Sequence, residues 1–185
     1  MVDMRLLAPE ATRTLKRVEY DQLVKMGAFD DERVELLEGV IVTMSPNYPE
    51  HASPVQFLNE MLLPALLGRA VVRIQLPVYA VRESEPQPDV AIVPLGDYRH
   101  AHPDQAHCLI EVAYSSLSKD RNIKAPLYAA SGFPEYWVVN VSERVVEVFR
   151  KPLHSGYRER TRHGVGETIA LLDFPDVRVE VAKLF

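Results

Sequence analysis

The chain has 185 residues, of which 47% are hydrophobic and 25% are charged, and its formal net charge is -5. This length fits one domain, and the hydrophobic fraction is large enough for a core, which argues against a globally disordered chain. The negative charge argues against a protein coated with basic surface, although it allows a local basic face. No apolar run approaches the roughly 20 residues that span a bilayer, and no signal-like segment is present, so we expect a soluble, cytoplasmic protein without a membrane partner.

Three segments show apolar residues at helical spacing, and each ends at a glycine, which commonly terminates helices. Asn47 or Ser45 is expected to cap the second helix, and Pro64 is expected to kink or shorten it. Residues 1–13 have no clear period and are interpreted as a loose N-terminal arm. The predicted helices span about 17–26, 48–68 and 118–130.

Strands are expected where β-branched and aromatic residues cluster or alternate with polar residues. Residues 33–44 predict two short strands folded at Glu38-Gly39, or one strand with a bulge. A proline places the strand at 71–80 near a sheet edge, whereas the apolar strand at 90–95 is expected to be central. The remaining strands are predicted at about 108–113, 136–141, 144–149, 157–162, 168–172 and 177–181.

The order of these elements predicts the fold class. Along the chain it is α-β-α-β-β-β-α-β-β with more strands at the end, which is typical of an α+β fold or of a mixed sheet with helices on its faces. No internal repeat, low-complexity tract or linker interrupts the order. We therefore expect a single domain over residues 1–185.

Two of the predicted strands carry carboxylates that are costly to bury without a partner. Asp89 opens one apolar strand, and Glu111 is the fourth residue of another. If the two strands are neighbours, both side chains can point to one edge of the sheet, where Mg²⁺ or Mn²⁺ would bind them together with water and substrate phosphate. The alternative is that Asp89 caps a turn and Glu111 pairs with an arginine.

The helix that follows these strands carries two polar residues on one face. Lys124 and Tyr128 are four positions apart, and Lys124 would reach back towards Glu111 if the helix packs over that strand. A lysine there would orient the attacking water or stabilise charge on phosphorus. The alternative is a solvated lysine. Lys119 is a competing candidate, but it lies in a loop or first helical turn, where its position is less constrained.

Two further residues are candidates for the same site. Glu35 would supply a third carboxylate if its strand borders the site, and the alternative is a surface acid beside a turn. His51 lies at the start of the second helix, where it would hydrogen-bond phosphate or water; the alternative is a surface histidine.

A positive stripe is predicted near the C-terminus. Arg158, Arg160 and Arg162 alternate with Glu159 and Thr161, so on a strand they share one face. Such a stripe would follow a phosphate backbone. The alternative is a solvated edge strand that its charges protect from aggregation.

Several other enzyme classes lack their motifs in this chain. There is no GxxxxGK[ST] loop, GxGxxG turn or HExxH pair, and no GxSxG elbow of a serine hydrolase. Cys108 is the only cysteine, and it lies in an apolar run. This excludes an intrachain disulfide and a cysteine metal cluster, and a cysteine hydrolase would have to depend on a residue predicted to be buried.

Several short segments of the chain match a known family in order and spacing. They are Glu35-Leu36-Leu37-Glu38-Gly39-Val40-Ile41, Met44-Ser45-Pro46 with His51, Ser84-Glu85-Pro86-Gln87-Pro88-Asp89-Val90, Glu111-Val112-Ala113-Tyr114-Ser115-Ser116-Leu117, then Asp120, Lys124, Tyr128, Ala129 and Gly132, and finally Glu135-Tyr136-Trp137-Val138-Val139. Over about residues 15–185 the sequence resembles the Uma-type restriction endonucleases, a family of the PD-(D/E)XK nuclease superfamily.

The resemblance implies a restriction-endonuclease-like α-β-β-β-α-β core, with a mixed central sheet flanked by helices and with extra C-terminal strands. It also implies a metal-dependent phosphodiesterase site. Asp89 would be the aspartate of the signature, Glu111 its second acid, and Glu35 an additional metal ligand. The lysine expected two residues after the glutamate is replaced by Ala113, and Lys124 matches the lysine that the resembling sequences place on the following helix.

The sequence departs from the family pattern at two other positions. Tyr114 stands where a small or acidic residue is expected, and Val40 stands where an acid is expected. Neither position is an inferred metal ligand. Both departures would alter the surroundings of the site.

The leading hypothesis is a Mg²⁺- or Mn²⁺-dependent endonuclease that hydrolyses nucleic acid, with DNA as the expected substrate. Asp89, Glu111 and Lys124 would be catalytic, with the carbonyl of Val112 as a further ligand. A homodimer would suit cleavage of both strands. The alternative is a catalytically inactive nuclease-fold protein that binds nucleic acid or a protein partner, and a two-carboxylate glycosidase is a third hypothesis.

Overall fold

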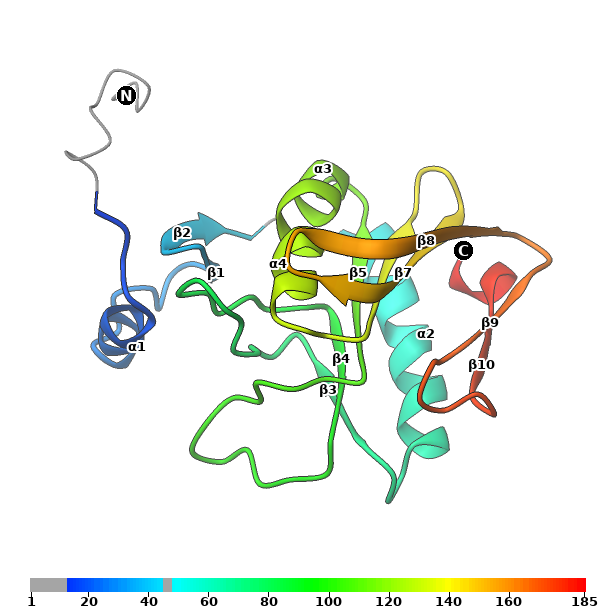
Figure 1. The fold of residues 1–185 in the computed structure, drawn as a ribbon, viewed down its shortest axis with the longest axis horizontal. Coiled ribbons are helices and arrows are strands. Elements are labelled where there is room, and N and C mark those ends of the chain that lie inside the picture. The colour runs from blue at the N-terminus through cyan, green and yellow to red at the C-terminus, as the bar shows by residue number, and fades with distance from the viewer. Residues whose placement is uncertain (1–12, 45–47) are drawn as a thin grey trace.

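The structure is a computed structural model and describes residues 13–44 and 48–185. Residues 1–12 of the predicted arm, and the predicted caps Ser45 and Asn47, lie outside the described residues. The fold is α+β, as predicted, with a six-stranded mixed sheet at its centre (Figure 1). Within the described residues, no helix has both the length and the apolar character needed to cross a bilayer.

The sheet has the spatial order β3-β4-β5-β6-β7-β8. Only β5 and β6 run parallel, and all other neighbours are antiparallel. The strand predicted at 71–80 is confirmed as an edge strand, and the strand predicted at 90–95 lies inside the sheet. The strands are β3 (Val71–Ile74), β4 (Val90–Val93), β5 (Cys108–Ala113), β6 (Glu135–Asn140), β7 (Val145–Leu153) and β8 (Gly156–Gly164).

The predicted α-β-β-β-α-β core is present. It consists of α2, then β3, β4 and β5, then a helical segment, then β6. The segment predicted as one strand at 71–80 ends at Ile74, because Gln75 has a positive φ of 51° that turns the chain out of the extended conformation. The helices are α1 (Arg17–Lys25), α2 (Pro49–Ala65), α3 (Leu117–Lys119), α4 (Ala125–Ala130), and a C-terminal 3-10 helix (Val181–Leu184).

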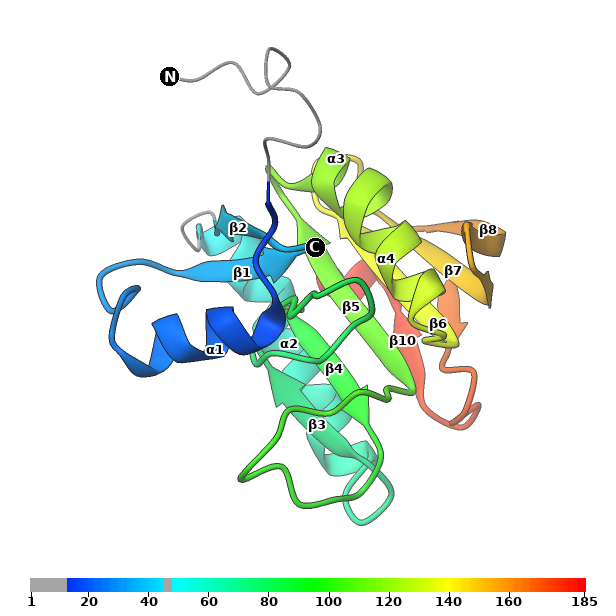
Figure 2. The ribbon, with the colours of Figure 1, turned by 60° about the vertical axis from the view of Figure 1, so that its left-hand side comes forward.

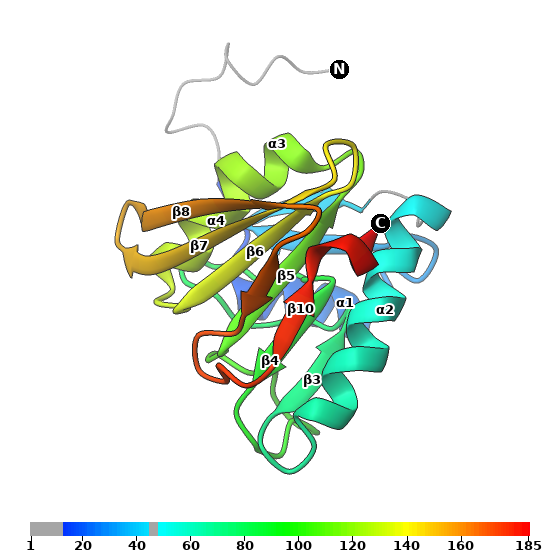
Figure 3. The same ribbon diagram turned by 90° about the vertical axis from the view of Figure 1, so that its right-hand side faces the viewer.

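The two faces of the sheet carry different layers. On one face, Ile110 and Val112 of β5 pack with α2 and the C-terminal elements (Figure 3). On the other face, Leu109 and Ala113 pack with α4, and α1 and the β1–β2 hairpin lie on the same side (Figure 2). Because side chains alternate along a strand, Glu111 points to this second face, towards the helical segment and the hairpin.

The C-terminal strands form a separate small sheet. The predicted strands at 168–172 and 177–181 appear as β9 (Thr168–Ala170) and β10 (Arg178–Glu180), which pair antiparallel with each other. They do not extend the central sheet. The chain leaves the sheet edge in a tight turn after β8, in which the Glu167 N–H donates to the Gly164 carbonyl. The two strands then cover the face that carries α2 (Figure 3).

Helix α2 ends at Ala65, three residues before the predicted end, and contains both Pro54 and Pro64; a kink or shortening caused by Pro64 stays a prediction. The third predicted helix, 118–130, is interrupted. A π-helical turn, Asp120–Lys124, lies between α3 and α4. Pro126 explains the interruption, because a proline has no N–H to donate to the carbonyl four residues earlier and its ring clashes with that carbonyl. The wider turn instead places the N–H of Ala125 against the carbonyl of Asp120.

The predicted fold at Glu38-Gly39 is confirmed as a hairpin of β1 (Val34–Leu37) and β2 (Val40–Thr43). Glu38 has a φ of 50° and Gly39 a φ of 75°, as the two central residues of a type I′ turn require. The hairpin matters to the site because β1 carries Glu35. The alternative of one bulged strand is wrong.

Replacing Gly39 with alanine is expected to lower the free energy of unfolding by about 2 kcal/mol. A Cβ atom at this position would lie 2.5 Å from the Cβ of Thr14 and 2.7 Å from the carbonyl oxygen of Leu15, and the positive φ adds strain. The matched control is Gly132→Ala, where φ is 80° and no atom lies within 4 Å of the added Cβ. Urea denaturation should show a loss of about 1 kcal/mol for the control. Equal losses would show that crowding at the hairpin turn is not the cause.

Candidate active site

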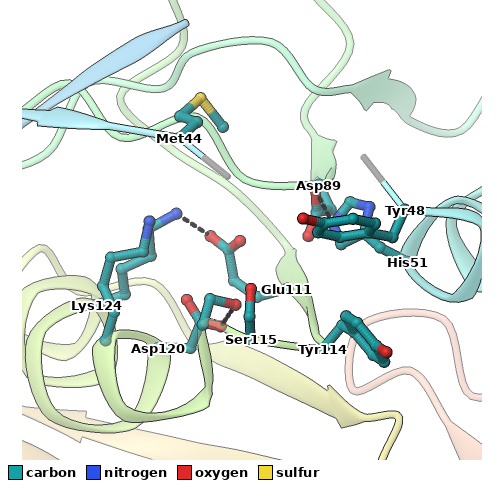
Figure 4. A pocket seen from close by; sticks show the side chains of 11 residues that line it. Met44, Tyr48, His51, Asp89, Glu111, Tyr114, Ser115, Asp120 and Lys124 are labelled. Carbon is teal, nitrogen blue, oxygen red and sulfur yellow. Dashed lines mark hydrogen bonds and ion pairs between the residues drawn. The ribbon is translucent and has the colours of Figure 1, made fainter. Parts of the chain in front are cut away.

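The two carboxylates predicted to meet are brought together at the start of β4 and the end of β5. Asp89 immediately precedes β4, and β4 pairs antiparallel with β5, so that Val90 lies opposite Ile110. The backbone N–H of Val112 donates to Oδ2 of Asp89 at 2.8 Å. This bond fixes Asp89 beside Glu111, and the two side chains line one pocket (Figure 4).

The pocket is small, with a volume of about 50 Å³. It lies between the start of α2, the ends of β2 and β5, and the helical segment after β5. Its volume suits water, a cation or phosphate oxygens. The residues that line it are Met44, Tyr48, His51, Asp89, Glu111, Tyr114, Ser115, Ser116, Lys119, Asp120 and Lys124.

Lys124 is buried between two carboxylates. Its Nζ lies 2.8 Å from Oε1 of Glu111 and 2.9 Å from Oε2 of Glu35. Tyr128, one helical turn later, donates its hydroxyl to the same Oε1 of Glu111 at 2.8 Å. The predicted reach of Lys124 back to Glu111 is therefore present, and so is the predicted shared face of Lys124 and Tyr128.

Lys119 is more constrained than the sequence indicates. Its Nζ lies 2.7 Å from Oε1 of Glu35, whose side chain is completely buried. The backbone N–H of Gln87 also donates to Oε2 of Glu35, at 3.2 Å. Glu35 thus borders the site as predicted, but two lysines occupy its oxygens and it does not line the pocket itself.

The two carboxylates that contact Lys124 have pKa values shifted in opposite directions. Burial raises the pKa of Glu111 well above its usual value, and the Lys124 ammonium only partly opposes this. Burial also acts to raise the pKa of Glu35, but Lys124 and Lys119 outweigh it and the net pKa is lowered. For Lys124, burial is outweighed by Glu111 and Glu35, so its pKa is raised and it stays protonated.

His51 lies beside Asp89, as the prediction of an additional site residue requires. Its Nε2 is 3.0 Å from Oδ1 of Asp89. The other ring nitrogen, Nδ1, is buried and has no hydrogen-bond partner among the described residues. Gln75 also donates to Oδ1 of Asp89, at 3.4 Å. Asp89 is therefore held from three sides, by His51, Gln75 and the backbone of Val112.

Asp120 is a pocket residue that the sequence analysis did not select. It is 1% exposed, and its Oδ1 has no hydrogen-bond partner among the described residues. Ser116 donates to its other oxygen. Burial raises the pKa of Asp120, and Lys124 opposes this. The available signal was the spacing of four residues between Asp120 and Lys124, which puts both on one helix face.

The arginine stripe lies on β8, at the far edge of the sheet from β3. None of its three members lines the pocket described above. Arg160 pairs with Glu147 at 2.8 Å and Arg162 with Glu143 at 2.5 Å. Acids therefore neutralise part of the predicted stripe, and a role in nucleic-acid binding stays a prediction for Arg158, Arg160 and Arg162.

The donor set fits a hard divalent cation. Among the described residues, no group of three or more His, Cys, Asp or Glu side chains is arranged to hold a metal ion. Magnesium, however, commonly uses one or two carboxylates together with water and substrate phosphate, and Asp89 and Glu111 supply two. Asp120 lines the same pocket and has an oxygen without a hydrogen-bond partner among the described residues, so a third carboxylate lies close to these two.

A second pocket, of about 240 Å³, lies under α1. Glu85 lines it with a side chain that is 7% exposed, and its Oε1 is 3.6 Å from Nε2 of His102. Burial, and secondarily the carboxyl of Asp21, raise the pKa of Glu85 to about 7, while Arg17 lowers it. This carboxyl is thus costly to ionise in the folded chain.

Glu85→Gln is therefore expected to stabilise the chain at pH 8 and to leave it nearly unchanged at pH 4. Because the folded-state pKa is raised, the folded chain binds more protons than the unfolded chain between about pH 4.5 and 7, so wild-type stability falls as pH rises through that window. The difference between the two chains should reach about 3 kcal/mol at pH 8. Urea denaturation at both pH values measures it, with the exposed Glu32→Gln as control. A pH-independent difference would contradict the raised pKa.

Comparison with known proteins places the chain in a family. The fold matches that of a solved structure described as a putative nuclease belonging to DUF820, from Anabaena variabilis ATCC 29413, with a TM-score of 0.77 at 15% sequence identity, over 92% of this chain and 97% of that chain. The model of the Uma2 family, described as "Putative restriction endonuclease", matches residues 17–182. The chain belongs to this family, which confirms the resemblance stated above. Comparison with curated proteins gives no significant match.

Proposed function

We propose that the chain is a Mg²⁺- or Mn²⁺-dependent endonuclease that hydrolyses phosphodiester bonds of nucleic acid. The observation that carries the proposal is the position of Asp89 and Glu111 in one small pocket, with a buried and protonated Lys124 in contact with Glu111. Two carboxylates and a lysine around a pocket of this size suit a cation and a phosphate group. Membership of the Uma2 family supports the nuclease assignment.

Asp89 and Glu111 would hold the metal, and the carbonyl of Val112 is a proposed further ligand because the N–H of this residue bonds to Asp89. A bound divalent cation would polarise a phosphoryl oxygen and favour in-line attack by water. Direct ligation by Glu35 stays a prediction, since Lys119 and Lys124 now occupy its oxygens.

Lys124 has two proposed roles. Its ammonium lies next to the space where the phosphate would bind, so it would stabilise negative charge that develops on the phosphoryl oxygens or orient the attacking water. Glu35 and Tyr128 support it indirectly: Glu35 keeps Lys124 protonated, and Tyr128 holds the carboxylate of Glu111. His51 would orient Asp89 through the contact at Oδ1.

DNA is the proposed substrate, and the remaining positive charge of β8 is a proposed contact with its backbone. A homodimer would suit cleavage of both strands. The second candidate function, a nuclease fold that binds nucleic acid or protein without catalysis, is favoured by the fact that two lysines already satisfy Glu35 and one of them satisfies Glu111. Metal binding separates the two candidates.

The test uses the purified chain with single-stranded, duplex and branched DNA and with RNA, in Mg²⁺, in Mn²⁺ and in EDTA. Asp89→Ala and Lys124→Ala are assayed beside the wild type. Cleavage that requires metal and is lost in both variants is the expected result. Cleavage that survives Asp89→Ala would point to contamination or to another site, and the absence of both cleavage and calorimetric metal binding would favour the non-catalytic candidate.

A further inference from the structure

Two tyrosines meet at the rim of the pocket without being buried. Tyr48 is 48% exposed and Tyr114 is 42% exposed. Their ring centroids are 5.9 Å apart, with an angle of 54° between the ring planes. Neither hydroxyl has a hydrogen-bond partner within residues 13–44 and 48–185. Burial in the core therefore does not account for the position of the two rings.

The pair is attached directly to the elements that carry the site. Tyr48 precedes the first residue of α2 and lies three residues before His51, whereas Tyr114 follows the last residue of β5 and lies three residues after Glu111. Both tyrosines line the pocket, and Figure 4 shows their rings on the Asp89 side of it, away from Lys124. A substrate bound at Asp89 would therefore pass the two rings.

The position of the two rings decides which part of a nucleotide they could meet. Asp89, Glu111 and Lys124 are buried and suit a cation and phosphate oxygens, whereas both rings are exposed. The base attached to a phosphate bound at these buried residues would lie towards the exposed rim of the pocket. Exposed aromatic rings at such a place offer a stacking surface, and each base stacked on an aromatic side chain contributes about 1–3 kcal/mol to binding.

We propose that Tyr48 and Tyr114 form a stacking surface for the nucleobase adjacent to the scissile phosphate, so that the substrate has an unpaired nucleotide at the cleavage position. This inference rests on the proposed nuclease function and names its substrate class. In a duplex both faces of each base are stacked on neighbours, and freeing one costs a few kcal/mol. Single strands, flaps and frayed ends present their bases without that cost.

The test measures binding separately from cleavage. Oligonucleotides that carry 2-aminopurine, single-stranded and in a matched duplex, are titrated with the chain in Ca²⁺, which replaces Mg²⁺ so that the strand stays intact. Stacking on tyrosine quenches 2-aminopurine fluorescence. We expect quenching with the single strand, about tenfold weaker binding in Tyr48→Ala and in Tyr114→Ala, and near-wild-type binding in Tyr114→Phe, which keeps the ring.

The matched control is Leu67→Ala, which removes an exposed apolar side chain beyond the far end of α2. Its binding should equal that of the wild type. In Mg²⁺, the alanine variants at Tyr48 and Tyr114 should raise KM for single-stranded substrate about tenfold and change kcat little, because the rings contact the base and not the reacting phosphate.

Outcomes separate this inference from the proposed function. Tight binding and quenching that depend on the two rings, without cleavage of any substrate, would support the stacking surface and remove the catalytic proposal. A second outcome is that the wild type cleaves with metal while neither alanine variant changes binding of the single strand or the duplex. That result would overturn the stacking surface and leave the proposed nuclease function in place. A wild-type chain that binds neither oligonucleotide would overturn the stacking surface.

Discussion

Replacing Asp89 with asparagine is expected to lower the rate of metal-dependent cleavage by about 10³-fold or more while the chain stays folded. The asparagine side chain has nearly the same shape, and its amide oxygen can still accept the 2.8 Å hydrogen bond from Val112. What is lost is a negative charge that would hold the cation. Calorimetry should accordingly show weaker Mg²⁺ or Mn²⁺ binding in the same variant.

The folded state should tolerate this change because Asp89 contributes repulsion as well as bonds. Its charge is one of those that raise the pKa of Glu111, so neutralising it relieves Glu111. The control is Asp97→Asn, which removes an exposed carboxylate paired with Arg99 and should leave cleavage unchanged. A fully active, metal-dependent Asp89→Asn would remove this residue from the proposed machinery.

The site residues that the sequence predicted are those whose charge conflicts with the apolar strands around them. Asp89 and Glu111 are carboxylates in apolar strands, and such residues need a partner. The helical spacing of Lys124 and Tyr128 supplied the partners, and the structure places both on one oxygen of Glu111. The expected burial of the strands and the helical spacing of Lys124 and Tyr128 were sufficient to predict these contacts, because β5 and the helix that follows it pack against each other.

The residues that the sequence did not place depend on contacts between distant segments or on an irregular turn. Lys119 and Glu35 are 84 positions apart in the sequence, and no local sequence pattern indicates that they pair. Asp120 shares a helix face with Lys124, but that spacing alone does not reveal its burial, and the π-helical turn Asp120–Lys124 accompanies this burial in the pocket. The turn was missed because a helical period alone does not reveal where a proline widens the helix.

The small C-terminal sheet also depends on contacts that a local pattern does not reveal. The sequence predicted strands at 168–172 and 177–181, but the alternation of residues along a strand does not indicate which strand it pairs with. β9 and β10 pair with each other, and they cover the face of the sheet that carries α2. Gly164 and Gly166 mark the turn that carries the chain away from β8, but a turn signal does not state which strand the following residues pair with.

Lys124→Met is expected to destabilise the chain by about 3–5 kcal/mol at pH 8, and by less at pH 5. The methionine side chain fills similar volume but leaves Glu35 and Glu111 buried without the ammonium between them. The pKa of Glu111 is already raised by burial, and it should rise further in the variant. The folded variant then binds more protons than its unfolded state, so its stability falls as pH rises.

Urea denaturation at the two pH values measures this dependence, with Lys119→Met as the matched control. Lys119 is more exposed than Lys124, and Glu35 is its one ion-pair partner among the described residues, so its replacement should cost about 1 kcal/mol. Adding Glu111→Gln to Lys124→Met should recover part of the loss, since it removes one unpaired charge.

If Asp89 and Glu111 hold a cation, millimolar Mg²⁺ should stabilise Lys124→Met more than wild type, because the ion replaces the missing positive charge. A loss that is equal at both pH values would show that packing, and not charge, is the role of Lys124.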